Sequence, residues 1–304
     1  MTPELIPFEA DALLSWQGLA DAFLEDHTKP KAEIGDTFLY RGEDTMLTRS
    51  AWIDGLGIAV KTANIMPGNP GRGEPMIHGA VNLYDDTTGL LEAIVDFHLV
   101  TKWKTAGDSA LGARLLARPD SKVVLIVGAR PVGRNLRMAY EAMFPDARFL
   151  IWNRSPEGAA KFADSFDKTE AVASLEEGFA QADIITSATM TTDPLIKGDW
   201  LRPGQHLDLI GAYRPDMREA DDTALTRARL FMDSRDTVLD HIGEFKDPLA
   251  RGVINRDDVV GDLYDHKDGV FQRAPEDITL YKNGGGAHLD LMTSRYILNA
   301  WRNR

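Results

Sequence analysis

The sequence lacks cysteine, long apolar runs and an excess of basic residues. The absence of cysteine excludes disulfides, thiolate metal sites and a cysteine nucleophile, so we expect a cytoplasmic protein without a metal site. No run approaches the length of about 18 apolar residues that spans a bilayer, and the N-terminal segment has no basic signal region. The 34 basic and 47 acidic residues leave a net charge of -13. Neither nucleic acid nor a membrane is therefore expected as a partner.

The 304 residues predict two domains, since a single core usually stops growing at about 250 residues. In the first part, an amphipathic helix at 9–25 precedes five strands, which we place at 37–40, 46–53, 56–63, 80–84 and 90–95. Hairpin-length connections predict a mostly antiparallel sheet. A helix at 97–118 follows and ends at Pro119. We therefore place an α+β domain at 1–118, completed by a final helix within about 287–304.

From residue 122 onward, apolar strands and helices alternate. The strands are expected at 123–127, 149–152, 184–187, 206–210 and 230–232. Alternation of this kind predicts a doubly wound parallel sheet with helices between its strands. We therefore expect an α/β fold with a Rossmann-type domain at 119–286.

A tight glycine turn links the strand at 123–127 to the helix that follows. This is how a dinucleotide-binding unit begins, with the fingerprint G-x-G-x-x-G. Gly128 and Gly133 occupy its first and third glycine positions, but Arg130 occupies the second. Arg130 either folds over the phosphates as a charged donor or prevents cofactor binding. We favour the first interpretation.

Three polar residues, Asn153, Arg154 and Ser155, follow the second strand of this domain. NAD-specific folds tend to place an acidic residue there, which contacts the ribose hydroxyls. Arg154 would instead pair with a 2'-phosphate, and no carboxylate is expected to oppose it. NADP(H) is therefore favoured over NAD(H). The alternative is an ordinary turn in which Ser155 caps a helix.

Several cations and one histidine could bind an anion. Lys61 lies near the end of an apolar strand, where it either reaches solvent or holds an anion in a cleft. Lys102 and Lys104 precede the glycine turn, and they form either a solvated helix face or a charge that neutralises a pyrophosphate. His78 is a candidate substrate contact, although a core histidine is the more common interpretation.

The segments VTKWKTAGDSALGARLLARPDS, VLIVGA, IWNRSPEGAAKFAD, ADIITSAT, GAYRPDMREADD and YKNGGGAHLD follow one another in this order. From Leu47 to the C-terminus, the chain resembles the ornithine cyclodeaminase and mu-crystallin family in these motifs. The resemblance implies a homodimer built on a substrate-binding first domain, with an NAD(P)-binding Rossmann domain inserted before the final helix. It also implies hydride transfer at the Cα of a small amino or imino acid.

The resemblance assigns roles to some residues of this chain, while other family positions have more than one candidate. The family's carboxylate-binding lysine falls on Lys61. Its helical Arg-Thr pair falls on Lys104 and Thr105, so a guanidinium is replaced by an ammonium. The family's first substrate-binding arginine has no secure equivalent, because Arg41 is nearest and a different gap placement puts Asp36 there.

The cofactor-binding Asn-Arg-Thr of mu-crystallin corresponds to Asn153, Arg154 and Ser155, which strengthens the expectation of NADP(H). Further candidate cofactor contacts lie in the turns of the Rossmann domain: Ala129, Val132, Ser187, Ala188, Thr189, Ile210 and Asn283.

The motif GAYRPD distinguishes two branches of the family. Where cyclodeaminases carry an aspartate that assists amine attack, this chain has Tyr213, followed by Arg214. The motif resembles the Ser-Arg-Pro-Asp of the mu-crystallin and ketimine reductase branch. A neutral tyrosine can relay a proton but is a weak base near neutral pH.

We therefore expect an NAD(P)H-dependent reductase of a cyclic imino acid, such as Δ1-pyrroline-2-carboxylate or Δ1-piperideine-2-carboxylate. Lys61, with Lys104 or Arg41, would hold the carboxylate, and Tyr213 or a water beside Arg214 would deliver the proton. The alternatives are an ornithine cyclodeaminase and a non-catalytic, NADP-binding protein like mu-crystallin.

Overall fold

The computed structural model describes residues 2–304, which divide into two compact units. Unit 1 contains the residues up to Lys104 together with Gly286–Arg304, and unit 2 contains Thr105–Gly285. The first division falls inside helix α2 (Phe97–Leu116), whereas the sequence places the domain boundary beyond the end of this helix, at residue 118.

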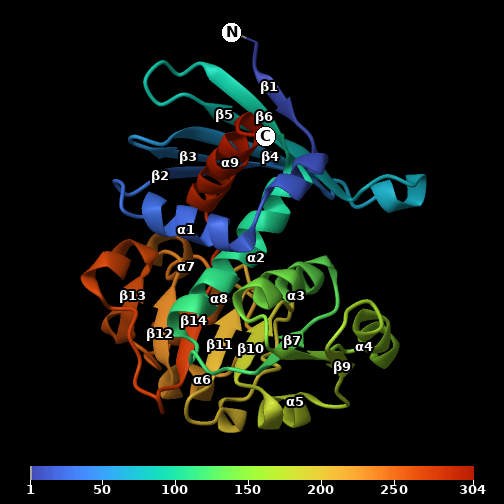
Figure 1. Ribbon diagram of the computed structural model, residues 1–304, viewed down its shortest axis with the longest axis vertical. Helices are drawn as coiled ribbons and strands as arrows, with labels where there is room; N and C mark the ends of the chain where they lie inside the picture. The colour runs from blue at the N-terminus through green and yellow to red at the C-terminus, as the bar shows by residue number, and fades with distance from the viewer. Residues whose placement is uncertain (1) are drawn as a thin grey trace. The chain divides into compact units, whose positions relative to one another are not determined.

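A six-stranded sheet forms the framework of unit 1, in the order β1-β6-β5-β4-β3-β2. Its strands are β1 (Glu4–Ile6), β2 (Glu33–Arg41), β3 (Asp44–Ile53), β4 (Gly57–Ile65), β5 (Ile77–Tyr84) and β6 (Leu91–Asp96). All neighbours are antiparallel except β1 and β6. The mostly antiparallel sheet is confirmed, and the missed strand β1 has only three residues, too few for a pattern. The β4–β5 connection extends away from the sheet (Figure 1).

Helix α9 (Ala287–Arg302) covers one face of this sheet and packs against β3 and β4 (Figure 1). Alternate residues of β4, Lys61 among them, are buried on that face. Helix α1 (Trp16–Asp26) lies against α9. The single helix predicted at 9–25 is wrong, because a 3-10 helix (Phe8–Leu13) ends first and Ser15 then caps α1, its Oγ accepting from the N–H of Gly18.

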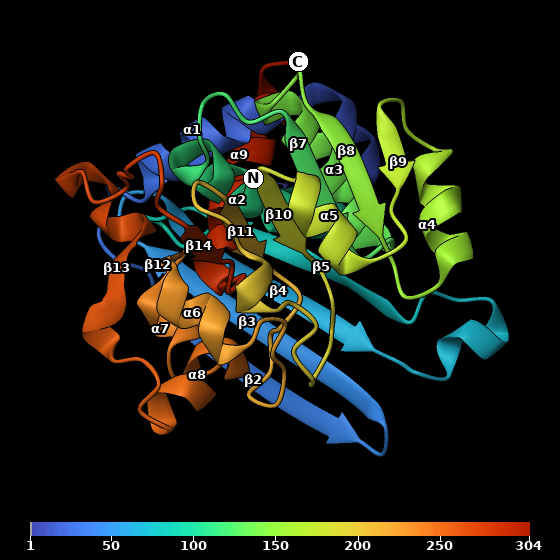
Figure 2. The ribbon, with the colours of Figure 1, turned by 90° about the horizontal axis from the view of Figure 1, so that it is seen from below.

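Unit 2 contains eight parallel strands in the order β13-β12-β14-β11-β10-β7-β8-β9, several of which are visible side by side in Figure 2. They are β7 (Val123–Val127), β8 (Arg148–Trp152), β9 (Thr169–Ala171), β10 (Ile184–Ser187), β11 (His206–Leu209), β12 (Arg229–Met232), β13 (Val259–Asp262) and β14 (Thr279–Lys282). The doubly wound α/β fold is confirmed. Strands β9, β13 and β14 were missed, because three or four residues next to turns give no clear periodicity.

Helices cover both faces of this sheet. They are α3 (Pro131–Met143), α4 (Pro156–Ala163), α5 (Leu175–Gln181), α6 (Asp222–Arg227), α7 (Arg235–Val238) and α8 (Gly243–Ala250). Helices α3 and α5 lie on opposite faces (Figure 1). Phe179 of α5 packs in one core with Leu125, while Tyr140 of α3 donates to Asp208 on the other face. Burial on both faces explains why strands such as β7 are apolar throughout.

Candidate functional site

The order of the strands in unit 2 reverses between β7 and β10. The chain runs from β7 to β8 and β9 on one side and returns to β10 on the other. Ligands of open α/β sheets bind at the carboxyl ends of strands at such a point. Gly128 follows β7 there, and a Cβ on Gly128 would lie 3.1 Å from the carbonyl oxygen of Ala188, just beyond β10. The predicted cofactor residues after β7 and β10 are therefore brought together.

The turn from β7 into α3 fits the pyrophosphate of a dinucleotide. Gly128 has a φ of +113°, which other residues rarely adopt. A Cβ on Gly133 would lie 2.0 Å from the carbonyl oxygen of Gly128, so only glycine allows α3 to pack this closely. The N–H groups of the first helical turn, Val132 and Gly133 among them, have no intrahelical partners and favour an anion.

Arg130, which departs from the glycine fingerprint, does not strain the backbone of this turn. It is the N-cap residue of α3 and has an extended backbone, with φ of -80° and ψ of 179°. An ordinary L-residue adopts these angles without strain. Its side chain is exposed. Neither the turn nor the packing of α3 therefore requires glycine at this position.

The end of β8 lies beside the glycine turn. Asn153 Oδ1 accepts a hydrogen bond from the N–H of Ala129 at 3.2 Å, and the Asn153 amide donates to the carbonyl of Ser155 at 3.1 Å. Ser155 caps α4, as its Oγ accepts from the N–H of Gly158. Asn153 thus links the two predicted cofactor turns, and the interpretation of Ser155 as a helix cap is also confirmed.

A carboxylate lies close to these polar residues. Glu157 Oε2 accepts a hydrogen bond from Ser155 Oγ at 2.8 Å, and this bond lowers the pKa of Glu157. Arg154, between Asn153 and Ser155, is exposed. Glu157, which the sequence did not single out, therefore places a carboxylate beside Ser155, in the same turn as the exposed cation of Arg154.

Buried Glu219, which the sequence did not single out, ties the ends of β10 and β11 together. Its Oε1 accepts from Ser187 Oγ at 2.6 Å and from the N–H and Oγ1 of Thr189 at 2.8 and 2.9 Å. Its Oε2 accepts from the N–H groups of Gly211 at 2.5 Å and Ala212 at 3.1 Å. The hydroxyls of two predicted cofactor residues are thus directed to this carboxylate. Ile210 joins the same strand ends by donating its N–H to the Ser187 carbonyl.

Two further buried ionisable side chains, Glu244 and Lys282, form hydrogen bonds in this region. Glu244 accepts from the N–H groups of Glu219 and Ala220 at 2.8 and 3.0 Å. Burial raises the pKa of Glu244 to about 7, although the charge of Lys282 opposes the shift. Lys282 Nζ donates to the carbonyl of Leu209, the last residue of β11, and to the carbonyl of Ala212 in the following loop.

Asn283, a predicted cofactor residue, anchors the part of α2 that belongs to unit 2. Its side-chain amide donates to the carbonyl of Thr105 at 2.9 Å and to Ser109 Oγ at 3.0 Å. Asn283 and Thr105 are therefore neighbours, as the expectation of a shared site requires.

In unit 1, Lys61 and Lys104 converge on one carboxylate. Lys61 Nζ donates to Asp290 Oδ1 at 2.9 Å and to Thr101 Oγ1 at 2.8 Å, and Lys104 Nζ donates to Asp290 Oδ2 at 3.2 Å. Lys61 is only 5% exposed, so its interpretation as a solvent-reaching lysine is wrong. Lys102 does not join them, because Asp11 holds it at 2.7 Å.

The charges in this cluster shift one another's titration. Burial raises the pKa of Asp290, but the charges of Lys104 and Lys61 outweigh burial and hold this pKa below its usual value. Burial lowers the pKa of Lys104 to about 8, against the charge of Asp290. At neutral pH Asp290 is therefore an ionised carboxylate, and it lies between the amino groups of Lys61 and Lys104.

Arg49, rather than Arg41, is the arginine beside Lys61. Arg41 lies at the β2–β3 turn, where it pairs with Asp44 at 2.8 Å and its side chain is 83% exposed. Arg49 is the direct cross-strand partner of both Lys61 on β4 and Asp36 on β2. The sequence did not single out Arg49. The pairing depends on strand register, which motifs do not show.

His78 lies away from this cluster. It pairs with Asn64 across β4 and β5, three positions along from Lys61, so its side chain is on the opposite face of the sheet. It is exposed and contacts His98 edge to face at 5.5 Å between ring centroids. The interpretation of His78 as a core histidine is wrong, and the structure does not bring it to Lys61.

Tyr213 and Arg214 follow β11 in an exposed loop. Tyr213 is 57% exposed. The Arg214 guanidinium donates to both carboxylate oxygens of Asp216 at 2.8 Å, and this pairing raises the pKa of Arg214. The phenol is therefore accessible as a proton relay, while the guanidinium is held by Asp216.

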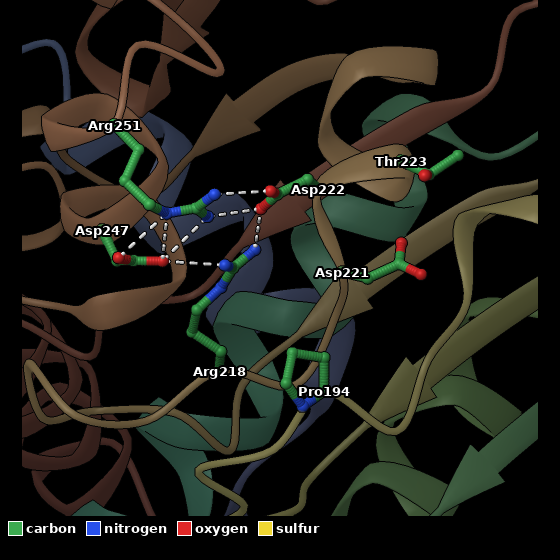
Figure 3. Close-up of a pocket in the computed structure, with 7 residues that line it drawn as sticks. All are labelled: Pro194, Arg218, Asp221, Asp222, Thr223, Asp247 and Arg251. Atoms are coloured by element: carbon green, nitrogen blue, oxygen red, sulfur yellow. Dashed lines mark hydrogen bonds and ion pairs between the residues drawn. The ribbon is translucent and has the colours of Figure 1, made fainter.

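An open cavity of about 410 Å³ in unit 2 is lined by none of these residues and is drawn in Figure 3. It is lined by Pro194, Arg218, Asp221, Asp222, Thr223, Asp247 and Arg251. Both arginines bind both Asp222 and Asp247, at 2.7 to 2.9 Å. These ion pairs connect α6 to α8. Because each arginine already has two carboxylate partners, the cavity does not indicate a site for a charged ligand.

Residues 2–304 contain no candidate metal site and no candidate membrane span. No cluster of three or more potential metal ligands occurs among them. Within the same residues, no helix combines the length and apolar character needed to cross a bilayer.

A family model for the ornithine cyclodeaminase/mu-crystallin family matches residues 45–304. The chain belongs to this family. The resemblance seen in the motifs is thereby confirmed. The match includes the whole of unit 2 together with Arg49, Lys61 and Asp290 of unit 1.

Individual family members are similar over most of their length. A Δ1-pyrroline-2-carboxylate reductase of Paracoccus denitrificans is 49% identical over 303 residues, which cover 97% of this chain and 96% of the relative. The ketimine reductase mu-crystallin of Rattus norvegicus is 31% identical over 245 residues, or 80% and 76% of the two chains. Thermococcus litoralis Δ1-pyrroline-2-carboxylate reductase, solved with NADH and L-proline, superposes with a TM-score of 0.88 at 26% identity and covers 99% of this chain and 98% of its own.

Proposed function

We propose that this family member is an NAD(P)H-dependent reductase that acts on the C=N bond of a cyclic imino acid of the Δ1-pyrroline-2-carboxylate type. The observation that carries the proposal is the 49% identity, over 97% of this chain, to a reductase of that substrate. The cationic cluster around Lys61 supports it, because a substrate carboxylate needs a positively charged partner.

Each part of the proposed reaction has a group to perform it. A nicotinamide cofactor would supply a hydride for the imine carbon. The turn at Gly128 and the start of α3 would hold its pyrophosphate. Lys61 has three N–H donors, of which Asp290 and Thr101 take two, so the third can bind the substrate carboxylate. Tyr213, or a water beside Arg214, delivers the proton to the imine nitrogen.

Pure protein should oxidise NADPH in the presence of Δ1-pyrroline-2-carboxylate and form proline, without releasing ammonia from ornithine. The reason is Tyr213, because a neutral phenol is a poor base for activating an attacking amine at neutral pH. Cofactor absorbance, proline and ammonia are measured with each substrate. Catalytic ammonia and proline from ornithine would instead identify a cyclodeaminase. Cofactor binding without any turnover would identify a binding protein.

NADP(H) should bind more tightly than NAD(H). Arg154→Ala should raise the dissociation constant of NADPH about tenfold or more, since the variant loses a charge-assisted contact to the 2'-phosphate. It should leave the dissociation constant of NADH nearly unchanged. Glu157→Gln is the matched variant that removes a negative charge, and it should strengthen NADPH binding by about two- to fivefold. Fluorescence titration gives all six dissociation constants. Equal or tighter binding of NADH by the wild type contradicts the preference.

The KM for the imino acid should rise as the pH rises through about 8. Burial lowers the pKa of Lys104 to about 8, so Lys104 is charged below that pH and loses its attraction for a carboxylate above it. Lys104→Arg keeps its charge and should abolish the rise. KM is measured from pH 6.5 to 9.5 for both proteins. An unchanged rise in Lys104→Arg would assign it to another group.

We further propose that two copies of the chain associate through the unit 1 sheet. On the face opposite α9, Leu39 and Met46 lie across from each other in β2 and β3, and they are 59% and 37% exposed. Trp52, 49% exposed, lies on the same face. Exposed apolar groups on one sheet face are typical of an interface. Sedimentation velocity tests this proposal. The cytoplasmic location stays a prediction.

A further inference from the structure

We propose that Arg49 of β3 supplies the guanidinium that binds the substrate carboxylate beside Lys61. This inference rests on the proposed function and adds a specificity-determining residue to it. The sequence could assign that role only to Arg41 or to the position of Asp36.

Strand register places the three side chains in one row. Arg49 is paired with Lys61 on one side and with Asp36 on the other. Directly opposed residues of antiparallel strands have Cα atoms about 4.5–5.5 Å apart and side chains on the same face. Lys61 contacts Asp290 of α9, so this is the face that α9 covers. Arg49 therefore points to the side of the sheet on which the lysines converge.

Asp36 holds this guanidinium in place. Arg49 Nε donates to both carboxylate oxygens of Asp36 at 3.1 Å, and Nη2 donates to Oδ2 at 3.0 Å. These bonds engage one edge of the planar group and fix its orientation. Asp36 thus acts as a positioning residue. It occupies the β2 position where one alignment puts the family's first substrate-binding arginine, and in this chain the arginine, Arg49, lies opposite it on β3.

The charges of this row, taken together with those of Lys104 and Asp290, favour one additional anion. Arg49, Lys61 and Lys104 are cationic, while Asp36 and Asp290 are anionic, so these five side chains have an excess of one positive charge. Arg49 also acts on the rest of the cluster through space. Burial has the largest effect on the pKa of Lys104 and lowers it, while the charge of Asp290 raises it. The charges of Lys61 and, to a smaller extent, Arg49 lower it further. A single carboxylate, as on a cyclic imino acid, would neutralise the excess.

The test compares Arg49→Gln and Arg49→Lys with Arg41→Gln, a matched loss of charge on the neighbouring strand. Arg49→Gln should raise the KM for Δ1-pyrroline-2-carboxylate by about 10- to 100-fold, the range expected for one charged hydrogen-bonded contact, with a smaller change in kcat. Arg49→Lys should be intermediate, because it keeps the charge and loses the planar fork. Arg41→Gln should match the wild type, and the Kd for NADPH should be the same in all four proteins.

A second measurement does not depend on turnover. Isothermal titration of the NADP-loaded proteins with pyrrole-2-carboxylate, a planar analogue of the imine, should show weaker binding to Arg49→Gln and wild-type binding to Arg41→Gln. A folded Arg49→Gln with wild-type KM and wild-type analogue affinity would overturn the inference, as would equal losses in both glutamine variants. If Arg49→Gln does not fold, an unchanged KM in Arg49→Lys overturns it. If the wild type reduces no cyclic imine, the proposed function fails, and the analogue titration still decides the role of Arg49.

Discussion

Lys61→Ala is expected to lower kcat/KM for the imino acid by about 100-fold or more and to destabilise the protein. The loss of activity follows from removing a buried cation that would bind the carboxylate and orient it for hydride transfer. The loss of stability follows from Asp290, which is left with Lys104 as its remaining lysine partner. Removing one member of a buried charge pair costs about 3–5 kcal/mol, and Lys104 should keep the cost near the lower end.

The structure changes this expectation in one respect. From the sequence alone, a ligand carboxylate is the only proposed partner of Lys61, so Lys61→Ala would leave stability almost unchanged. The hydrogen bonds from Lys61 to Asp290 and Thr101 show that it also has protein partners. Activity and stability should therefore fall together.

The measurements for Lys61→Ala are steady-state kinetics, urea unfolding and NADPH titration. Lys102→Ala is the matched control, because Lys102 also forms an ion pair in unit 1, with Asp11, outside the cluster. It should retain activity. The NADPH affinity of a folded Lys61→Ala should be normal, since the cofactor cradle lies in unit 2. Wild-type turnover by Lys61→Ala would remove Lys61 from the reaction.

The sequence predicted those parts of the fold and site that short segments encode. Strand β7, the turn at Gly128 and helix α3 are contiguous, so their pattern and their glycines are visible together. Lys61 and Lys104 were singled out by their places near an apolar strand and before the glycine turn, and the family resemblance then assigned their roles. Short strands such as β9 were missed because three residues carry too little periodicity.

The residues that the sequence missed act through distant partners. Arg49 matters because register places it between Asp36 and Lys61. Asp290 lies 229 positions from Lys61 along the chain and meets it only when α9 packs on the sheet. Composition and spacing cannot reveal such contacts, because a one-residue change in register would turn Arg49 to the other face. Buried carboxylates that accept hydrogen bonds from several donors can be recognised only in the three-dimensional structure.

Glu219→Ala should have the largest effect on stability and should also weaken cofactor binding. The variant removes an acceptor that satisfies buried or half-buried donors at the ends of both β10 and β11. Each abandoned buried donor costs about 1–3 kcal/mol, so a loss of at least about 3 kcal/mol in the free energy of unfolding is expected. Because Ser187 and Thr189 lie at the strand switch point, their displacement should weaken NADPH binding by about tenfold.

Glu219→Gln should restore little of the lost stability or NADPH affinity, although glutamine has nearly the size of glutamate. That result would show that the loss comes from the missing hydrogen-bond acceptors and not from the missing side-chain volume. An amide has one accepting oxygen, and its nitrogen would face donors instead of acceptors. Glu177→Gln is the matched control, since Glu177 is exposed and its carboxylate accepts a backbone hydrogen bond from Ala173 at 3.1 Å. Urea unfolding and NADPH titration are measured for all three variants. If Glu219→Gln were as stable as the wild type and bound NADPH normally, the negative charge would not be what holds the two strand ends together, and their positions would have to depend on the surrounding packing alone.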